Sequence, residues 1–269
     1  MKFKAASAIL FLAVSAVADF PAGNQAFDRG HYEKAILEYE KTLAKGHVSS
    51  ALHHNLANAY LEHGREQGGG IGTGTTSLGR AIYHYRLARR LNPRDTQNRA
   101  NLLRAREIVH GQPPREPPLR VFTGWLTLNE WAGAASLCLT LSLLLLTARQ
   151  VHAPWQNRWG IGAHLLLGVG AGLGAMAWAA WDYQSAEDEA ITIRETPLYK
   201  RPLTPTEVPE SVAPSHTDPD PISDGIELNI MDRRNGGWLK VAFEEGALRR
   251  SGWIQQATSD GPNLLVFPP

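Results

Sequence analysis

The chain has 269 residues, a formal net charge of +1 and one cysteine. This charge balance gives no reason to expect a nucleic-acid partner, and a single cysteine excludes an intramolecular disulfide. Apolar residues make up 43% of the chain and are gathered in blocks, which excludes one continuous globular core. Membrane segments are therefore considered first.

The N-terminus has the pattern of an export signal. Two lysines precede an apolar run over residues 5–18, which ends in Ala16-Val17-Ala18, a small-residue site of the kind that signal peptidase cuts. We predict a signal peptide over residues 1–18. The alternative is an uncleaved N-terminal anchor, which would still deliver the following residues to the far side of the membrane.

An internal repeat follows in residues 19–111. Residues 30–43 align with residues 78–93 at an offset of 46 residues, which pairs alanine, isoleucine and tyrosine positions: Ala35 with Ala81, Ile36 with Ile82, and Tyr39 with Tyr85. The offset equals the tetratricopeptide (TPR) period of about 34 residues plus a glycine-rich insertion at residues 66–77. We predict repeats at 20–46 and 50–93 and a covering helix at 96–110, which Asp95 can cap.

Small and aromatic residues occupy the positions at which TPR helices pack. We expect close helix packing at Ala35, Tyr39, Leu56, Ala57, Tyr60, Ala81, Tyr85 and Ala88, with Pro93 ending the second repeat.

A TPR-like array usually binds an extended peptide or a partner protein. The candidate partner-binding residues are Asn55, Asn58, Arg86, Arg89 and Arg90, and the arginine-rich second half of the array would suit an acidic partner. Two alternatives stay open, because the array can be a packed spacer and the arginines a solvated face.

Two apolar segments come next and predict a transmembrane hairpin. We expect a linker at 112–124, spans at 125–148 and 159–181, and a turn at 149–158 that contains two arginines and no acid. Arginines also precede the first span, so the signal peptide decides the orientation. We therefore expect the turn in the cytoplasm and both soluble parts outside it, on a bacterial inner membrane.

The last segment, residues 182–269, predicts a small all-β domain with a proline-rich loop at 196–224. Short apolar runs around Ile191, Leu228, Trp238 and Trp253 alternate with turn residues. The order of these elements resembles bacterial SH3-type (SH3b) domains. The residues that carry the match are Gly225, Trp238, Lys240, Val241, Gly252 and Trp253, and we expect Trp238, Val241, Gly252 and Trp253 to form the core.

The two soluble parts differ in charge. Residues 19–118 contain 14 Lys/Arg and 10 Asp/Glu, whereas residues 182–269 contain 8 and 15. Opposite charges on tethered domains favour contact, but surface ion pairs are individually weak and screened by salt. We therefore expect loose, salt-sensitive docking between the two parts; the alternative is that the acidic residues only keep the proline-rich loop soluble.

Catalytic signatures are not recognisable in the sequence. No nucleophile or carboxylate pair lies in a known catalytic motif, and the histidines lack partners at metal-ligand spacing. We predict a protein that is not an enzyme and needs no cofactor or metal.

The arrangement as a whole resembles the aerotolerance Bat-operon TPR proteins (BatE-like). The likeness rests on residues 20–43, 51–60, 80–102 and 126–131, and on the glycine-tryptophan elements near the C-terminus. It implies a scaffold that works with von Willebrand A-domain membrane proteins and a MoxR-type ATPase in envelope stress tolerance. We expect the TPR domain to bind one partner and the SH3b-like domain a second partner or the cell wall. The alternative is a peptidoglycan-binding protein in which the repeats serve as a spacer.

Overall fold

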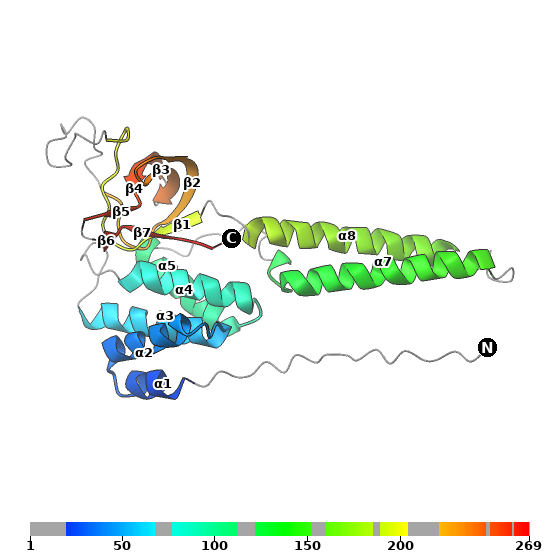
Figure 1. The fold of residues 1–269 in the computed structure, drawn as a ribbon, viewed down its shortest axis with the longest axis horizontal. Coiled ribbons are helices and arrows are strands. Elements are labelled where there is room, and N and C mark those ends of the chain that lie inside the picture. Colours follow the sequence, from blue (N-terminus) through cyan, green and yellow to red (C-terminus); the bar gives the residue numbers. More distant parts are fainter. Residues whose placement is uncertain are drawn as a thin grey trace.

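The computed structural model describes residues 20–67, 77–111, 122–151, 160–184, 189–203, 221–245, 248–259 and 261–268. The predicted signal peptide lies outside these residues, as do most of the glycine-rich insertion, the linker, the cytoplasmic turn and the proline-rich loop. Figure 1 shows three parts: a stack of helices, a small β-sheet against it, and a long helical hairpin that projects away from both.

Paired antiparallel helices form the N-terminal region, as predicted. They are α1 (Pro21–Asp28), α2 (Tyr32–Ala44), α3 (Ser50–Glu66), α4 (Ser77–Leu91) and α5 (Thr96–His110). Each helix packs chiefly on the next one along the chain, which is the arrangement of a helical repeat. Local signals set the helix ends: the Ser49 hydroxyl accepts from the Leu52 N–H, and the Asp95 carboxylate accepts from the Asn98 N–H.

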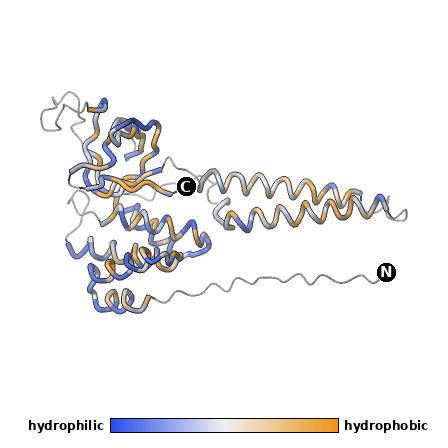
Figure 2. The backbone as a smooth tube through the Cα atoms, viewed as in Figure 1, coloured by the Kyte–Doolittle hydropathy of each residue, from blue (hydrophilic) through white to orange (hydrophobic). Residues whose placement is uncertain are grey.

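The hairpin consists of α7 (Leu128–Val151) and α8 (Gly160–Gln184), which pack along each other. Ser142 donates a hydrogen bond of 2.8 Å to the Ala163 carbonyl, and Gly170 lies close against Cys138 and Leu139. In Figure 2 the hairpin is almost entirely white and orange, whereas blue residues are frequent in the other two parts. Each helix contains a 21-residue apolar stretch, and less than a fifth of its most apolar 18-residue window is buried, so both helices are long and apolar enough to cross a membrane.

The C-terminal part is a small antiparallel sheet, as predicted. Its strands are β1 (Glu189–Thr192), β2 (Glu227–Arg234), β3 (Trp238–Glu245), β4 (Leu248–Gln255) and β7 (Leu264–Val266), in the order β4-β3-β2-β1-β7. The short strands β5 (Ala257–Thr258) and β6 (Gly261–Pro262) form a separate hairpin.

The sheet curls toward a barrel. The backbone that continues from β1 pairs with β4, because the amides of Tyr199 and Trp253 each donate to the other residue's carbonyl, at 2.8 and 2.7 Å. The final strand β7 returns to pair with β1. One chain segment thus joins both ends of the sheet, as closure of a small barrel requires.

The helices and the sheet share one hydrophobic core, which corrects the prediction of loose docking. Apolar residues of α4 and α5, such as Ile82 and Val109, belong to the same buried cluster as Ile191 and Phe267 of the β domain. Opposite net charges indicated attraction but carry no information about apolar complementarity, which arises only when both domains are folded.

Candidate functional site

One face of the helical repeat carries a hydrogen-bonded cluster centred on Asn24 of α1. The Asn24 Oδ1 accepts from the Tyr39 hydroxyl at 2.8 Å and from the Asn55 Nδ2 at 3.1 Å. Tyr39 lies on α2 and Asn55 on α3, so this first asparagine cluster joins three successive helices.

A second asparagine cluster repeats the same chemistry. The Asn58 Oδ1 accepts from the Tyr85 hydroxyl at 2.6 Å and from the Asn101 Nδ2 at 3.0 Å. Asn58 follows Asn24 by 34 residues. Tyr85 follows Tyr39, and Asn101 follows Asn55, by 46 residues in each case. The offset of 34 residues is one repeat period, and the offset of 46 residues is one repeat period plus the glycine-rich insertion. The two clusters therefore occupy structurally equivalent positions of the repeat.

The tyrosines of both clusters are neutral hydrogen-bond donors. Burial raises the pKa of Tyr39 to about 12, and the nearby Asp28 carboxylate adds to this effect. Burial and the Glu62 carboxylate likewise raise the pKa of Tyr85. Glu62 follows Asp28 by one repeat period of 34 residues, so the electrostatic surroundings of the two clusters are repeated as well.

The central asparagines are half-buried, and each keeps its side-chain NH2 group for a ligand. Their Oδ1 atoms accept two hydrogen bonds, which also fixes the orientation of the side-chain amide. Within the described part of the chain, the Nδ2 groups of Asn24 and Asn58 donate to no other residue. An asparagine Nδ2 complements a peptide carbonyl, so the pair presents two equivalent donors on one face.

The predicted partner-binding arginines lie elsewhere, between the helices and the β domain. Arg86 of α4 is buried and forms ion pairs with Glu189 and with Glu227, the latter at 3.0 Å. Arg106 of α5, another arginine of the basic second half of the array, lies 2.8 Å from the same Glu227 oxygen. Arg86 therefore serves contacts within the chain. Removal of one member of such a buried pair leaves the other charge buried without its partner, which lowers the free energy of unfolding by about 3–5 kcal/mol.

The C-terminal end of the chain covers the same arginines. The Phe267 ring stacks on Tyr83 at 4.9 Å between centroids, and the guanidinium carbon of Arg86 lies 4.1 Å from its centre. Arg90 lies 5.1 Å from the Phe267 ring centre and donates to the Pro268 carbonyl at 2.8 Å. Arg86 and Arg90 thus anchor the last residues of the β domain to α4.

The β domain also caps α4. Both oxygens of Asp224 accept backbone hydrogen bonds from the first turn of the helix, from Leu78 at 3.2 Å and Gly79 at 3.1 Å. A carboxylate here satisfies orphan N–H groups and complements the helix dipole. Burial nevertheless outweighs these hydrogen bonds and raises the pKa of Asp224 to about 7.

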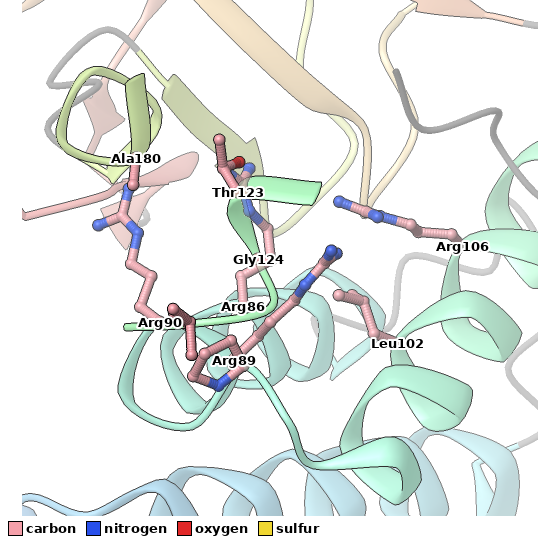
Figure 3. Close-up of a pocket in the computed structure, with 10 residues that line it drawn as sticks. Arg86, Arg89, Arg90, Leu102, Arg106, Thr123, Gly124 and Ala180 are labelled. Carbon is pink, nitrogen blue, oxygen red and sulfur yellow. The ribbon is translucent and has the colours of Figure 1, made fainter. Parts of the chain in front are cut away.

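A cavity of about 80 Å³ lies where α4 and α5 meet the base of the hairpin. Figure 3 shows Arg86, Arg89, Arg90 and Arg106 around it, together with the residues that precede α7 and with Ala180 of α8. Arg89, the remaining predicted partner-binding arginine, therefore lies on the side of the helical region that faces the hairpin. The asparagines and the arginines predicted as one site belong to two separate surfaces.

The residues predicted for packing lie inside the molecule. The helical positions Ala35, Tyr39, Leu56, Ala57, Tyr60, Ala81, Tyr85 and Ala88 are buried, and Pro93 lines the arginine cavity. In the β domain Trp238, Val241 and Trp253 are buried, and a side chain at Gly252 would overlap Leu198. Trp238 and Trp253 pack with Tyr199 and so form part of the core instead of an exposed aromatic platform.

Two histidines meet between α3 and α4. The Nδ1 atoms of His53 and His84 are 3.0 Å apart, and the His84 ring stacks on Tyr60. Burial lowers the pKa of His84 to about 3, with a further contribution from His53. Over the residues with described placement, no group of three histidine, cysteine or carboxylate side chains gathers as a metal site would require.

The comparisons with known proteins leave the interpretation to the geometry. No protein-family model matches the chain. No curated protein matches it either.

Proposed function

We propose that the protein is a membrane-anchored scaffold without enzymatic activity, and that its helical repeat binds an extended segment of a partner protein. The observation that carries the proposal is the repetition of the asparagine cluster along one face. Asn24 and Asn58 present equivalent Nδ2 donors, each fixed by two hydrogen bonds to its Oδ1. An extended polypeptide presents carbonyl groups at regular intervals, so a periodic row of amide donors suits it.

The proposed location is a bacterial inner membrane, with α7 and α8 as two spans. The helical region and the β domain share a core, so both must lie on the same side of the membrane that the hairpin crosses. A signal peptide at residues 1–18 would make that side extracytoplasmic. Residues 149–158 would then form the cytoplasmic turn.

Partner classes follow from the resemblance to the Bat-operon TPR proteins. We propose a von Willebrand A-domain membrane protein as the occupant of the asparagine face, within a system that includes a MoxR-type ATPase and acts in envelope stress or aerotolerance. The β domain would bind a second partner or the cell wall. Under the alternative, a peptidoglycan-binding protein, the helical repeat would act as a spacer and its asparagine face would bind nothing.

Site-specific photocrosslinking in intact cells tests the proposal. Ala51 of α3 is exposed and lies one helical turn before Asn55 on the same face, so a photoreactive residue there should crosslink to the occupant of that face. The crosslinked partner is identified by mass spectrometry. A von Willebrand A-domain protein supports the proposal, and the absence of any crosslinked product from this face supports the alternative.

Two controls make the experiment specific. The same photoreactive residue at Leu37, which is exposed on α2, should give no such product. Asn58→Asp in the Ala51 background removes the Nδ2 donor but keeps an oxygen acceptor for Tyr85 and Asn101, and it should reduce crosslinking several-fold, since a lost hydrogen bond is worth about 1 kcal/mol. Equal crosslinking from both positions would contradict a specific partner face.

A further inference from the structure

The arginine cavity lies at the level where a membrane surface would meet the helical region. Ala180 lines it and is the last residue but one of the apolar stretch Ile161–Trp181, and Leu126 lines it two residues before the stretch Leu128–Ala148. Both spans therefore end at the cavity. A ligand in it would lie at the depth of lipid headgroups.

The lining combines positive charge with an apolar side. Four arginines from α4 and α5 contribute guanidinium groups, and the described lining residues include no carboxylate. Apolar contacts come from Pro93, Leu102, Leu126 and Ala180. A guanidinium group binds phosphate oxygens in a bidentate manner, and the apolar side suits the part of a lipid that adjoins its phosphate.

The arginines are held in place before any ligand arrives. Arg86 and Arg106 pair with acidic residues of the β domain, and Arg90 contacts the C-terminal Phe267. A phosphate would therefore meet guanidinium groups that have already lost their side-chain entropy, which favours binding.

An adjoining depression of about 220 Å³ extends the basic surface toward solvent. It shares Arg89, Pro93 and Gly124 with the cavity and adds Arg94, Arg99 and the exposed Trp125, together with Asp95, whose carboxylate is occupied in capping α5. Trp125 precedes the first apolar stretch by three residues, the position that tryptophans prefer at a membrane interface. The basic surface and its interfacial tryptophan favour a lipid over a soluble phosphate compound.

We propose that this cavity binds the phosphate of an anionic phospholipid. The proposal rests on membrane anchoring by α7 and α8, which is part of the function proposed above, and it adds a specific lipid class. Binding would fix the helical region, the β domain and the two spans against the membrane surface at one point. Basic pockets next to transmembrane helices bind anionic headgroups by this chemistry.

Lipid retention by the full chain tests the proposal. The protein is reconstituted into vesicles of phosphatidylcholine with and without phosphatidylglycerol, re-extracted in mild detergent, and its bound lipid is measured by native mass spectrometry. We expect enrichment of phosphatidylglycerol over phosphatidylcholine. Arg89→Gln with Arg99→Gln should reduce that enrichment by about fivefold per arginine, and Arg89→Lys, which keeps the charge and loses the bidentate fork, by less.

The matched control removes the same charge elsewhere. Arg29→Gln with Arg65→Gln changes two exposed arginines on α3 and next to α1, and it should leave lipid enrichment as in the wild type. Thermal unfolding of each variant shows whether its fold is intact. Equal enrichment in the cavity variant and in the control variant overturns the proposal.

Two further measurements are needed. One distinguishes a lipid phosphate from a soluble phosphate compound, and the other distinguishes the lipid-site proposal from the membrane-anchoring proposal. If inorganic phosphate and glycerol phosphate displace the bound lipid completely, the cavity serves a soluble phosphate compound and the lipid proposal is wrong. Flotation of the protein with pure phosphatidylcholine vesicles after an alkaline wash reports membrane anchoring alone. Flotation without phosphatidylglycerol enrichment therefore refutes the lipid site and leaves the anchoring intact.

Discussion

Gly79→Ala gives the sharpest test of the contact between α4 and the β domain. A Cβ atom at Gly79 would overlap the Thr192 carbonyl oxygen and lie 2.5 Å from the Asp224 Oδ1. In an open helix the same substitution stabilises by about 1 kcal/mol, because alanine has the higher helix propensity. The sign of the effect therefore shows whether the two domains meet at this point.

The expected loss follows from what the helix must give up when it moves away from the sheet. Separation removes the two backbone hydrogen bonds to Asp224, and loss of a cap costs about 0.5–2 kcal/mol. It also strains the buried ion pairs of Arg86 and Arg106, whose complete loss would cost about 3–5 kcal/mol. Since partial relaxation recovers some of this, we expect Gly79→Ala to lower the free energy of unfolding by about 2 kcal/mol or more.

Thermal unfolding of the full chain in mild detergent measures this difference. A loss of about 2 kcal/mol corresponds to a decrease in Tm of about 4–8 °C for a chain of this size. Hydrogen exchange should increase in the first turn of α4, where Leu78 and Gly79 lose their acceptor. Gly133→Ala is the control, because no atom lies within 4 Å of a Cβ at that helical position. A Gly79→Ala variant that unfolds at or above the wild-type temperature would refute the reasoning.

Three further substitutions test the interface and its buried titratable groups. Glu227→Gln should destabilise the chain by about 3–5 kcal/mol in chemical denaturation, since two buried arginines lose their shared carboxylate, whereas Glu62→Gln in an exposed pair should cost about 0–1 kcal/mol. The raised pKa of Asp224 makes the folded state bind an extra proton between its ordinary pKa of 3.8 and about 7, so its contribution to stability falls as pH rises through that window. Asp224→Asn should abolish this part of the pH dependence of Tm. The lowered pKa of His84 acts in the opposite direction: stability is lost as pH falls from 6.5 toward about 3, by at most about 1.4 kcal/mol per pH unit, and His84→Phe should reduce that loss. A variant whose Tm follows the wild-type pH profile would contradict the assignment for its group.

Features with local causes could be predicted from the sequence. The covering helix α5 begins and ends where the sequence indicated, because Asp95 caps it and Gly111 adopts a left-handed conformation at its end. The repeat offset rests on helix packing positions such as Tyr39 and Tyr85, which occupy equivalent places in the asparagine clusters. Length and apolar composition were sufficient for the hairpin, since both are properties of a single segment.

The helix–sheet interface could not be predicted, because it depends on residues far apart in the chain. Asp224 and Gly79 are 145 residues apart, and nothing in the sequence near Gly79 shows that its missing side chain admits another backbone. The strand β7 and Phe267 were missed for the same reason, since a short C-terminal segment has no pattern of its own. Arg86 was predicted to bind a partner protein, because its acidic partners within the chain lie beyond the two apolar helices.

The cap that Asp224 provides has a consequence for the order in which the protein matures. Residues 77–111 leave the ribosome long before residues 189–227, and both helices of the hairpin are made in between. Until the β domain emerges, the first turn of α4 lacks its carboxylate, and Arg86 and Arg106 lack their acidic partners. Completion of the helical repeat therefore waits until residues 189–227 have been synthesised, so a chain that stops before them would retain an α4 whose first turn is uncapped and open to proteases.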